Sequence, residues 1–293
     1  MKGILLAGGK GSRLFPITKA TCKQLLPIYD KPMIYYSLSI LLMAGIKEIL
    51  LICTPEDRSR FVQLLGDGCQ WGISIEYAIQ DEPRGIADAF RIGEKFIAKQ
   101  PVALILGDNL FYGHNLPQVL QSASSHHEGA LIFGYEVQDP QRYGVIQFDE
   151  NQKVVGIIEK PLDPPSRFAV TGLYFYDHQV VEIAKDLKPS KRGELEITDV
   201  NVAYLKEGSL RCHLFERGFA WLDTGTPDAM QKAATYVQTL QERQGVKIGC
   251  IEEIAHQMGF IDEEKLQQLA EALSPSEYGD YLKRLGRLRW VLA

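Results

Sequence analysis

The sequence has no long apolar run and no strong excess of one charge. No window approaches the ~18 consecutive apolar residues of a transmembrane helix, and the apolar stretch after Met1 is too short for a secretory signal, so we expect a cytoplasmic protein that does not enter a membrane. A formal net charge of −5 argues against broad binding to nucleic acid or anionic membranes, although it leaves room for a local basic pocket.

Cysteine and histidine are also sparse. The five cysteines are an odd number, lie scattered and form no C-x-x-C pair, so reduced thiols are expected rather than a zinc or redox site. His126 and His127 lie in a Ser-rich polar stretch that is expected at the surface, and the other histidines are isolated, so none is an evident catalytic base. What is present is a globular composition, with 45% hydrophobic and 24% charged residues in 293, which excludes a disordered chain.

Apolar runs of strand length alternate with helical segments in the first third of the chain. The runs are continuous, as is typical of strands buried on both faces of a parallel sheet. They occupy residues 4–7, 49–53, 73–78 and 102–106. Helices are predicted between them at residues 33–44, 58–65 and 86–98, with Gly45 ending the first. This order predicts an α/β fold with a doubly wound, mostly parallel sheet.

The remainder of the chain has a different texture. Strand-like segments separated by turn residues predict an antiparallel insertion on the parallel sheet. They lie at residues 130–137, 144–148, 154–158 and 169–176. After Pro227 the pattern is mainly helical, and Leu282, Leu285 and Leu288 are expected to dock a last helix onto the core or onto a neighbouring subunit. We predict a main domain over residues 1–244 and a small C-terminal helical subdomain over residues 245–293.

A glycine-rich loop directly follows the first predicted strand. In residues 6–14 (LAGGKGSRL) the glycines let backbone N–H groups approach an anion closely, because no Cβ intervenes. The loop does not match a P-loop, and Leu14 stands where the dinucleotide motif G-x-G-x-x-G requires its last glycine. With Arg13 and Lys23 close in sequence, the loop suits a triphosphate cradle; the alternative is a tight turn with solvated charges.

Residues 6–14 and residues 23–27 (KQLLP) together resemble the signature of the sugar-nucleotide pyrophosphorylases, and residues 29–36 (YDKPMIYY) resemble the glucose-1-phosphate thymidylyltransferases among them. The resemblance spans essentially the whole chain, through residues 106–109, 159–161, 170–174, 193–199 and 220–226. It implies a Rossmann-like fold of the nucleotidyltransferase type, with a nucleotide half over about residues 1–110 and an antiparallel sugar-binding part over about residues 130–226. Residues 81–84 (DEPR) depart from the Pro-Ser-Pro-Asp that such sequences carry.

The resemblance also implies a reaction. Such enzymes join dTTP and α-D-glucose 1-phosphate into dTDP-glucose and pyrophosphate with Mg²⁺, the first step of dTDP-deoxysugar synthesis such as that of dTDP-rhamnose. A homotetramer and feedback by a dTDP-sugar are implied as well. Both substrates are polyanions, and two unit charges about 4 Å apart repel by roughly 4 kcal/mol at an effective dielectric constant near 20, so cations must hold them together. A sugar phosphate has a second pKa of about 6 and is largely dianionic at neutral pH, so no enzymic base is required.

The resemblance implies a role for each candidate residue. Arg13, Lys23 and Lys160 are the implied catalytic cations, and Asp108 and Asp223 are the implied metal ligands. The implied nucleotide-binding residues are Leu6, Ala7, Gly8, Gly9, Gly11, Gln24, Gln80 and Gly85. The implied sugar-phosphate-binding residues are Asn109, Gly144, Glu159 and Val170.

The charged candidates also make chemical sense. Asp108 follows a predicted strand, at the edge where open α/β sheets bind ligands, and one or two carboxylates with substrate phosphates are the usual ligands of Mg²⁺. The alternatives are a turn aspartate at Asp108 and a helix-capping one at Asp223. Glu159 suits sugar hydroxyls and Lys160 suits a phosphate, and the alternative for this pair is an exposed ion pair at a strand end.

Two glutamines bear on the choice of nucleotide. Gln24 and Gln80 offer both donor and acceptor to an imide edge, which suits thymine or uracil better than adenine. Thymine and uracil differ by one methyl group worth about 0.8 kcal/mol, so we predict a preference for dTTP with measurable use of UTP. The alternatives are the same fold acting on UTP, CTP or ATP, and a non-catalytic sugar-nucleotide sensor, which would not need all the charged candidates.

Overall fold

Parallel strands form the centre of the sheet, as predicted. The structure is a computed structural model that describes residues 1–9, 11–125 and 128–285, so the predictions for His126, His127 and Leu288 lie outside the described residues. Within these ranges a nine-stranded sheet has the order β10-β9-β11-β6-β1-β4-β5, with β8 and β12 on a branch from β11. The parallel strands are β1 (Lys2–Ala7), β4 (Glu48–Cys53), β5 (Ser74–Ile79) and β6 (Val102–Leu106).

One long strand attaches the antiparallel insertion to this centre. β11 (Phe168–Tyr176) pairs antiparallel with β6, β8 and β9, so the insertion continues the central sheet and the prediction is confirmed. The other strands of the insertion are β8 (Ala130–Glu136), β9 (Gly144–Phe148), β10 (Val154–Glu159) and β12 (Leu210–Leu214). Two short ladders lie outside the sheet, β2 (Pro27–Ile28) with β3 (Lys31–Pro32) and β7 (Asn109–Tyr112) with β13 (Ala220–Asp223).

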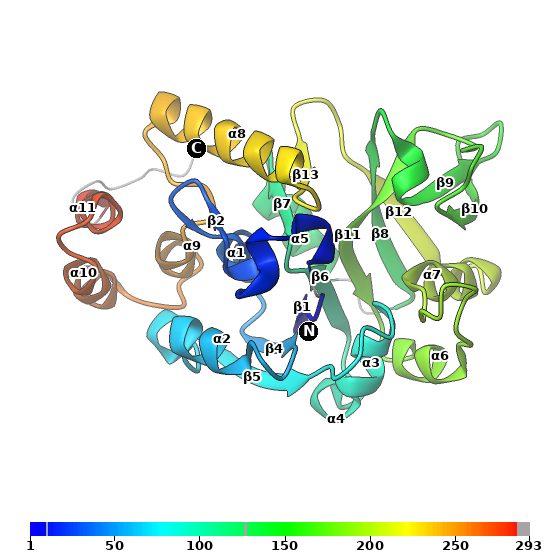
Figure 1. Ribbon diagram of the computed structural model, residues 1–293, viewed down its shortest axis with the longest axis horizontal. Helices are drawn as coiled ribbons and strands as arrows, with labels where there is room; N and C mark the ends of the chain where they lie inside the picture. The colour runs from blue at the N-terminus through cyan, green and yellow to red at the C-terminus, as the bar shows by residue number, and fades with distance from the viewer. Residues whose placement is uncertain (10, 126–127, 286–293) are drawn as a thin grey trace.

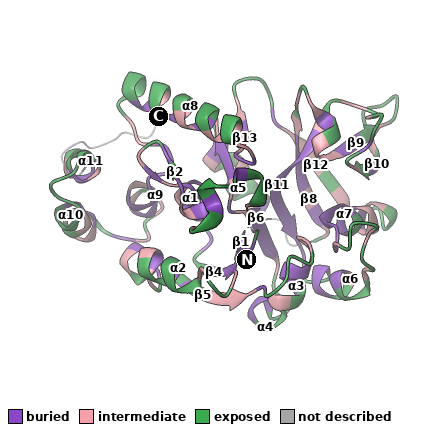
Figure 2. Ribbon diagram, viewed as in Figure 1, coloured by how far each residue is buried: buried purple, intermediate pink, exposed green. Residues whose placement is uncertain are grey.

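Helices cover both faces of the sheet (Figure 1), because neighbouring residues of the apolar strands point to opposite faces. Leu5 packs into the core of one face and Ile4 into that of the other. The first face carries α1 (Met33–Met43), α2 (Arg58–Leu65), α5 (Leu116–Ser124), α9 (Ile251–Gln257), α10 (Glu263–Ala272) and α11 (Glu277–Leu285). The second carries α3 (Asp88–Ile92), α4 (Glu94–Ile97), α6 (Val180–Asp186) and α7 (Ile197–Lys206). Figure 2 shows the buried strands between helices whose outer sides are exposed.

The helix predicted over residues 86–98 is wrong in extent, because α3 and α4 are separate at Gly93. A Cβ at Gly93 would lie 3.1 Å from Ile4 Cδ1, so the glycine lets the chain pass close to β1. The helix also starts later than predicted, because Ala87 N donates a hydrogen bond to Leu195 O at 3.2 Å. A tertiary contact therefore draws residues 84–87 away from the helix and toward the segment that precedes α7.

Of the C-terminal helices, α9 packs against α1, and α10 and α11 pack onto α9; all three lie at the opposite end of the molecule from β9 and β10 (Figure 1). Leu282 and Leu285 are buried in the shared core, which confirms that the last described helix docks there. Glu252 is also buried and accepts hydrogen bonds from Trp71 Nε1 at 3.1 Å and Tyr278 Oη at 2.6 Å. The boundary predicted after residue 244 coincides with the end of α8 (Pro227–Gln244), and the domain division itself stays a prediction.

No helix in the described part of the chain combines the length and the apolar character needed to cross a bilayer. The folding features that matter for function lie at one edge of the sheet. The segments after β1 and after β6 leave parallel neighbouring strands in the same direction, so the glycine-rich loop and Asp108 emerge side by side.

Candidate functional site

Two adjoining cavities open at this edge. The first, called here the acidic cavity, has a volume of about 230 Å³ and is lined by residues that include Asp108, Glu159 and Asp223. The second, called here the glutamine cavity, has a volume of about 220 Å³ and is lined by residues that include Gln24 and Gln80. The two cavities share the lining residues Ile86, Leu106, Asp108 and Glu194. A ligand with two dissimilar ends can therefore occupy both, with Asp108 at the junction.

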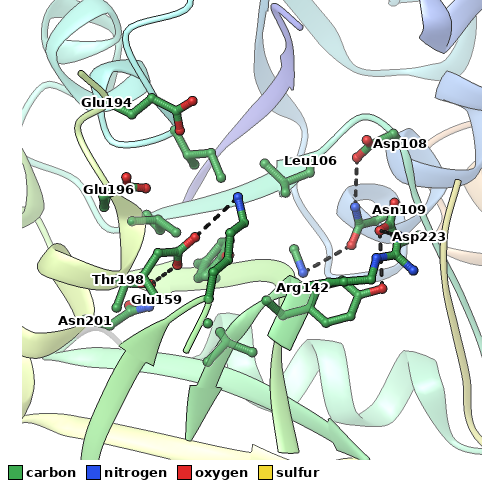
Figure 3. Close-up of a pocket in the computed structure, with 18 of the residues that line it drawn as sticks. Leu106, Asp108, Asn109, Arg142, Glu159, Glu194, Glu196, Thr198, Asn201 and Asp223 are labelled. Atoms are coloured by element: carbon green, nitrogen blue, oxygen red, sulfur yellow. Dashed lines mark hydrogen bonds and ion pairs between the residues drawn. The ribbon is translucent and has the colours of Figure 1, made fainter. Parts of the chain in front are cut away.

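One end of the acidic cavity is formed by two aspartates (Figure 3). The pairing of β7 with β13 sets Asp223 opposite Asn109, the residue after Asp108. The chain after Asp223 is fastened to the same place, because Thr224 donates from its N–H and its hydroxyl to Asp108 O at 3.3 and 2.9 Å. Two segments more than 100 residues apart thus present carboxylates to one space.

Each aspartate is paired with a basic side chain. Lys23 Nζ lies 2.5 Å from Asp108 Oδ2, and Arg142 Nη2 lies 3.2 Å from Asp223 Oδ2. Burial by itself would raise the pKa of Asp108, but the charge and hydrogen bond of Lys23, with a hydrogen bond from Asn109, outweigh it and lower that pKa below its usual value. Asp108 is therefore a carboxylate at neutral pH.

Asn109 holds the aspartate end together. Its Nδ2 donates to Asp108 Oδ1 at 2.8 Å, and its Oδ1 accepts from Gly172 N at 3.1 Å and from Trp221 Nε1 at 2.6 Å. The side chain lines the acidic cavity, yet these contacts bind β7 to β11 and β13. Its predicted role toward a sugar stays a prediction, and its contacts show that it orients Asp108.

The opposite end of the acidic cavity is formed around Glu159 (Figure 3). Its Oε2 accepts from Thr198 Oγ1 at 2.6 Å, and its Oε1 lies 3.2 Å from Arg192 Nη2 and 3.7 Å from Lys160 Nζ. Gly144 pairs with Glu159 in the β9–β10 ladder, and a Cβ there would lie 3.4 Å from Glu159 Oε2, so a glycine keeps space open beside the carboxylate.

Lys160 and Arg192 bring positive charge to this end. Lys160 adopts φ 44°, a backbone conformation that is uncommon for a side-chain-bearing residue and is enriched at functional sites. Arg192 spans the acids around it, with Nη2 2.7 Å from Glu196 Oε2 and 3.3 Å from Glu194 Oε2. Hydrogen bonding to Glu196 raises the pKa of Arg192 further above its usual value.

The glycine-rich loop closes the cavities from the side of β1. Gly11 has φ 60°, and its carbonyl accepts from Thr18 Oγ1 at 2.7 Å, so the loop is pinned before the short helix at Ser12–Leu14 that carries Arg13. The guanidinium of Arg13 approaches the Asp223 turn, since a Cβ on Gly225 would lie 3.2 Å from Arg13 Nη2. Arg13 is exposed and lines the acidic cavity.

The structure brings nearly all the predicted residues together. The acidic cavity is lined by Arg13, Asp108, Asn109, Gly144, Glu159, Lys160, Val170 and Asp223, and the glutamine cavity by Leu6, Gly8, Gly9, Gln24, Gln80 and Gly85. Lys23 contacts Asp108, which lies at the junction of the two cavities. Ala7 and Gly11 line neither cavity, because Ala7 is buried in the core and Gly11 shapes the turn. The chemical roles of all these residues stay predictions.

Sequence reasoning missed several residues of the acidic cavity. Arg142, Tyr143, Arg192, Thr198 and Trp221 all line it. Trp221 and Thr198 lie inside segments that were matched by resemblance, so those segments were the available signal for them. Arg192 lies just before the matched segment 193–199, and no local pattern distinguishes it from a solvated arginine.

The described part of the protein supplies too few side chains to hold a divalent metal ion by itself, so a bound phosphate compound would have to complete the coordination. No group of three or more His, Cys, Asp or Glu residues able to hold a metal occurs among residues 1–9, 11–125 and 128–285. Asp108 and Asp223 supply two hard carboxylates beside one cavity. Their negative charges are balanced by the side chains of Lys23 and Arg142. Two carboxylates completed by phosphate oxygens and water are a common ligand set for a hard divalent cation.

Comparison with known proteins gives a consistent picture. The sequence profile of the nucleotidyl transferase family matches residues 2–239. The chain is 55% identical to a glucose-1-phosphate thymidylyltransferase of Neisseria meningitidis over 97% of this chain and 99% of that protein, and 53% identical to one of Mycobacterium tuberculosis over 97% and 99%. It resembles a crystal structure from Bacillus anthracis, assigned as a glucose-1-phosphate thymidylyltransferase in complex with sucrose, with TM-score 0.75 and 44% identity over 80% of this chain and 94% of that one. A UDP-glucose pyrophosphorylase complexed with UDP-glucose gives TM-score 0.71 and 27% identity, over 81% and 98%.

Proposed function

The chain belongs to the nucleotidyl transferase family, among the glucose-1-phosphate thymidylyltransferases, and from this premise we propose that it joins dTTP and α-D-glucose 1-phosphate into dTDP-glucose and pyrophosphate. One observation carries the proposal. Two cavities of different chemistry meet at a carboxylate, and the glycine-rich loop lies beside the junction. The glutamine cavity suits a base, the acidic cavity suits a sugar, and the phosphates would lie between them at Asp108.

The basic side chains would bring the two anionic substrates together. Arg13 and Lys23 lie beside the loop and the junction, where a triphosphate would lie, while Lys160 and Arg192 lie at the glutamate end, where a sugar phosphate would lie. The pair of Lys23 with Asp108 balances the charge at the junction, and Lys23 would turn to the phosphates when a triphosphate binds. Neutralising the repulsion between the two substrates is worth roughly 4 kcal/mol for each pair of unit charges about 4 Å apart at an effective dielectric constant near 20.

The reaction then needs positioning more than proton transfer. A sugar-phosphate oxygen attacks the α-phosphorus, a new P–O bond forms, and pyrophosphate leaves with the electrons of the broken bond. No histidine lines either cavity among the described residues, which fits a nucleophile that is already ionised. Asp108 and Asp223 would hold Mg²⁺, which when bound supplies positive charge to the phosphate oxygens.

Glu159 and its neighbours would orient the sugar. The carboxylate accepts from Thr198 and Arg192 and retains lone pairs for sugar hydroxyls. Val170 lies where the β11–β8 ladder changes register, so backbone groups in residues 171–173 are freed from pairing with β8 beside the cavity. These features support a pocket for a hexose in preference to a larger or apolar group.

The deciding experiment is a product assay. Purified protein with dTTP, α-D-glucose 1-phosphate and Mg²⁺ should release pyrophosphate and form dTDP-glucose, with weaker use of UTP and little use of CTP or ATP. Equal efficiency with dTTP and UTP, or a preference for ATP, would contradict the nucleotide assignment. Tight binding of dTDP-glucose without any turnover would instead indicate a sensor.

The cellular setting is part of the same proposal. We expect a cytoplasmic homotetramer that is inhibited by a downstream dTDP-sugar and supplies a dTDP-deoxysugar pathway such as that of dTDP-rhamnose. Light scattering of the purified protein tests the tetramer, and inhibition by dTDP-rhamnose at fixed substrate concentrations tests the feedback. A monomer with no response to dTDP-sugars would refute this part and leave the reaction standing.

A further inference from the structure

Two glutamines form the polar floor of the glutamine cavity, and each is held by a different partner. Gln80 is 4% exposed, and its Nε2 donates to Gly85 O at 3.3 Å and to Asp88 Oδ2 at 3.2 Å. Both neighbours of this nitrogen are acceptors, so the reversed amide would set its oxygen against a carbonyl and a carboxylate. The orientation is therefore fixed, and Gln80 Oε1 faces Gly8, where a Cβ would lie only 2.5 Å away.

Gln24 is oriented in the opposite sense. It is also 4% exposed, and its Oε1 accepts from Cys22 Sγ at 2.8 Å. Burial raises the pKa of the Cys22 thiol to about 12, so the thiol keeps its proton at neutral pH and has it to donate to this oxygen. Gln24 Nε2 has no hydrogen-bond partner among the described residues. It is not among the fully buried side-chain atoms that lack a partner, so it can donate to a ligand in the cavity that Gln24 lines.

The floor thus presents one acceptor, Gln80 Oε1, and one donor, Gln24 Nε2. An imide edge such as that of thymine or uracil carries an N–H donor beside carbonyl acceptors and matches this pair, whereas cytosine has an acceptor at the ring nitrogen and a donor amino group. We propose that Asp88 and Cys22, neither of which lines the glutamine cavity, are positioning residues that fix the two amides and so make the site select an imide base over cytosine. This inference rests on the proposed function, because it takes the glutamine cavity to be the base pocket.

Asp88 is expected to contribute more than Cys22. Its carboxylate is 3% exposed, accepts from Gln80 and is paired with Arg84 Nε at 3.4 Å, so it is a charged and fixed acceptor. A thiol is a weak donor, and Gln24 loses less when it is removed. Loss of Asp88 should therefore lower the preference for dTTP over dCTP more than loss of Cys22 does, an order that general damage to the pocket would not reproduce.

The test measures kcat/KM for dTTP, dUTP and dCTP with Asp88→Leu and Asp88→Asn. Asp88→Leu removes the charged one of the two acceptors of Gln80 Nε2 and leaves Gly85 O, so the preference for dTTP over dCTP should fall at least fivefold. Asp88→Asn keeps an acceptor oxygen and should retain most of that preference. The ratio of dTTP to dUTP should stay within twofold of the parent in both variants, since both bases share the imide edge.

Matched controls separate positioning from general damage. Glu94→Leu also replaces a carboxylate by leucine, in an exposed side chain on the neighbouring helix α4 that is paired with Lys185 at 2.6 Å, and should leave all three ratios unchanged. Cys22→Ala should lower the dTTP-to-dCTP preference by about two- to fivefold, and Cys22→Ser, which keeps a donor, should restore it. If Asp88→Leu does not fold, the Cys22 pair decides.

Two results would overturn the proposal. One is a folded Asp88→Leu variant whose dTTP-to-dCTP ratio stays within twofold of the parent; the other is an equal fall in the dTTP-to-dCTP and dTTP-to-dUTP ratios, which indicates a loosened pocket. The parent is assayed first, so a failure of the proposed function shows as absence of dTDP-glucose. In that case calorimetric binding of dTDP and dCDP to the parent and to Asp88→Leu still tests the amide orientation.

Discussion

A single methyl group at Gly85 should disable the glutamine cavity. Gly85 adopts φ 108°, and a Cβ there would lie 2.4 Å from Leu195 O and 2.6 Å from Leu195 N. The two segments cannot part freely, because Leu195 N donates to Arg84 O at 2.7 Å and Ala87 N donates to Leu195 O at 3.2 Å. Relieving the overlap in Gly85→Ala requires a displacement of about 1 Å, and a misplacement of about 1 Å at a reacting site costs on the order of 10²-fold in rate.

Gly218→Ala supplies the matched control. Gly218 has φ 98°, close to that of Gly85, but a Cβ there would meet no atom within 4 Å. Both substitutions carry the strain of a side chain at positive φ, about 1–3 kcal/mol, and only Gly85→Ala adds the clash. Steady-state kinetics with thermal melting should show a loss of about 10²-fold in kcat/KM for dTTP with Gly85→Ala, while Gly218→Ala loses stability and keeps kcat/KM within twofold. The reasoning fails if folded Gly85→Ala uses dTTP as well as Gly218→Ala does.

Four further predictions concern two residues of the acidic cavity and two residues outside it. Asp223→Asn should lower kcat by at least about 10²-fold at saturating Mg²⁺, and an unchanged kcat would remove this residue from the metal site. Lys160→Ala should raise KM for glucose 1-phosphate at least tenfold with little change in KM for dTTP; equal changes in both would contradict its place at the sugar phosphate. Burial holds the pKa of Glu253 above its usual value despite a hydrogen bond from Tyr281. The contribution of Glu253 to stability is therefore complete below the unfolded pKa of about 4.3 and is lost as pH rises through the folded pKa. Glu253→Gln should raise Tm at pH 8 but not at pH 4, and a rise at pH 4 alone would refute this. Cys69 is the exposed cysteine among the five free thiols, so Cys69→Ser should abolish the fast phase of maleimide labelling, and a persistent fast phase would show that another thiol is open.

Local pattern predicted the sheet well because its strands are buried on both faces. β6 and α2 begin and end at the predicted residues, and Gly45 ends α1 with φ 80° as expected. The prediction over residues 86–98 was wrong because two long-range contacts, of Gly93 with β1 and of Ala87 with Leu195, override the local helical tendency. The contact with Leu195 has no signature within this window, whereas Gly93 is a local signal that hydrophobic periodicity does not use.

Site residues that lie within a motif were predictable from the sequence, whereas those that only the tertiary structure brings to the site were not. Asp108 and Glu159 lie in matched segments at strand ends, and the structure brings both to the acidic cavity. Arg142 reaches Asp223 across 81 residues of sequence, and Arg192 reaches Glu159 across 33. Such basic residues are recognised only after the sheet has placed their partners, since an isolated arginine in a loop is usually solvated.

The orientation of a side-chain amide in the site cannot be read from residue identity. Gln24 and Gln80 are the same residue type in the same cavity, and resemblance gives them the same role, yet one presents a donor and the other an acceptor. The difference arises from the partner behind each amide, a thiol in one case and a carboxylate in the other. Because a glutamine costs little to reverse in water but much against buried acceptors, the selectivity of such a pocket depends on residues that a ligand never touches.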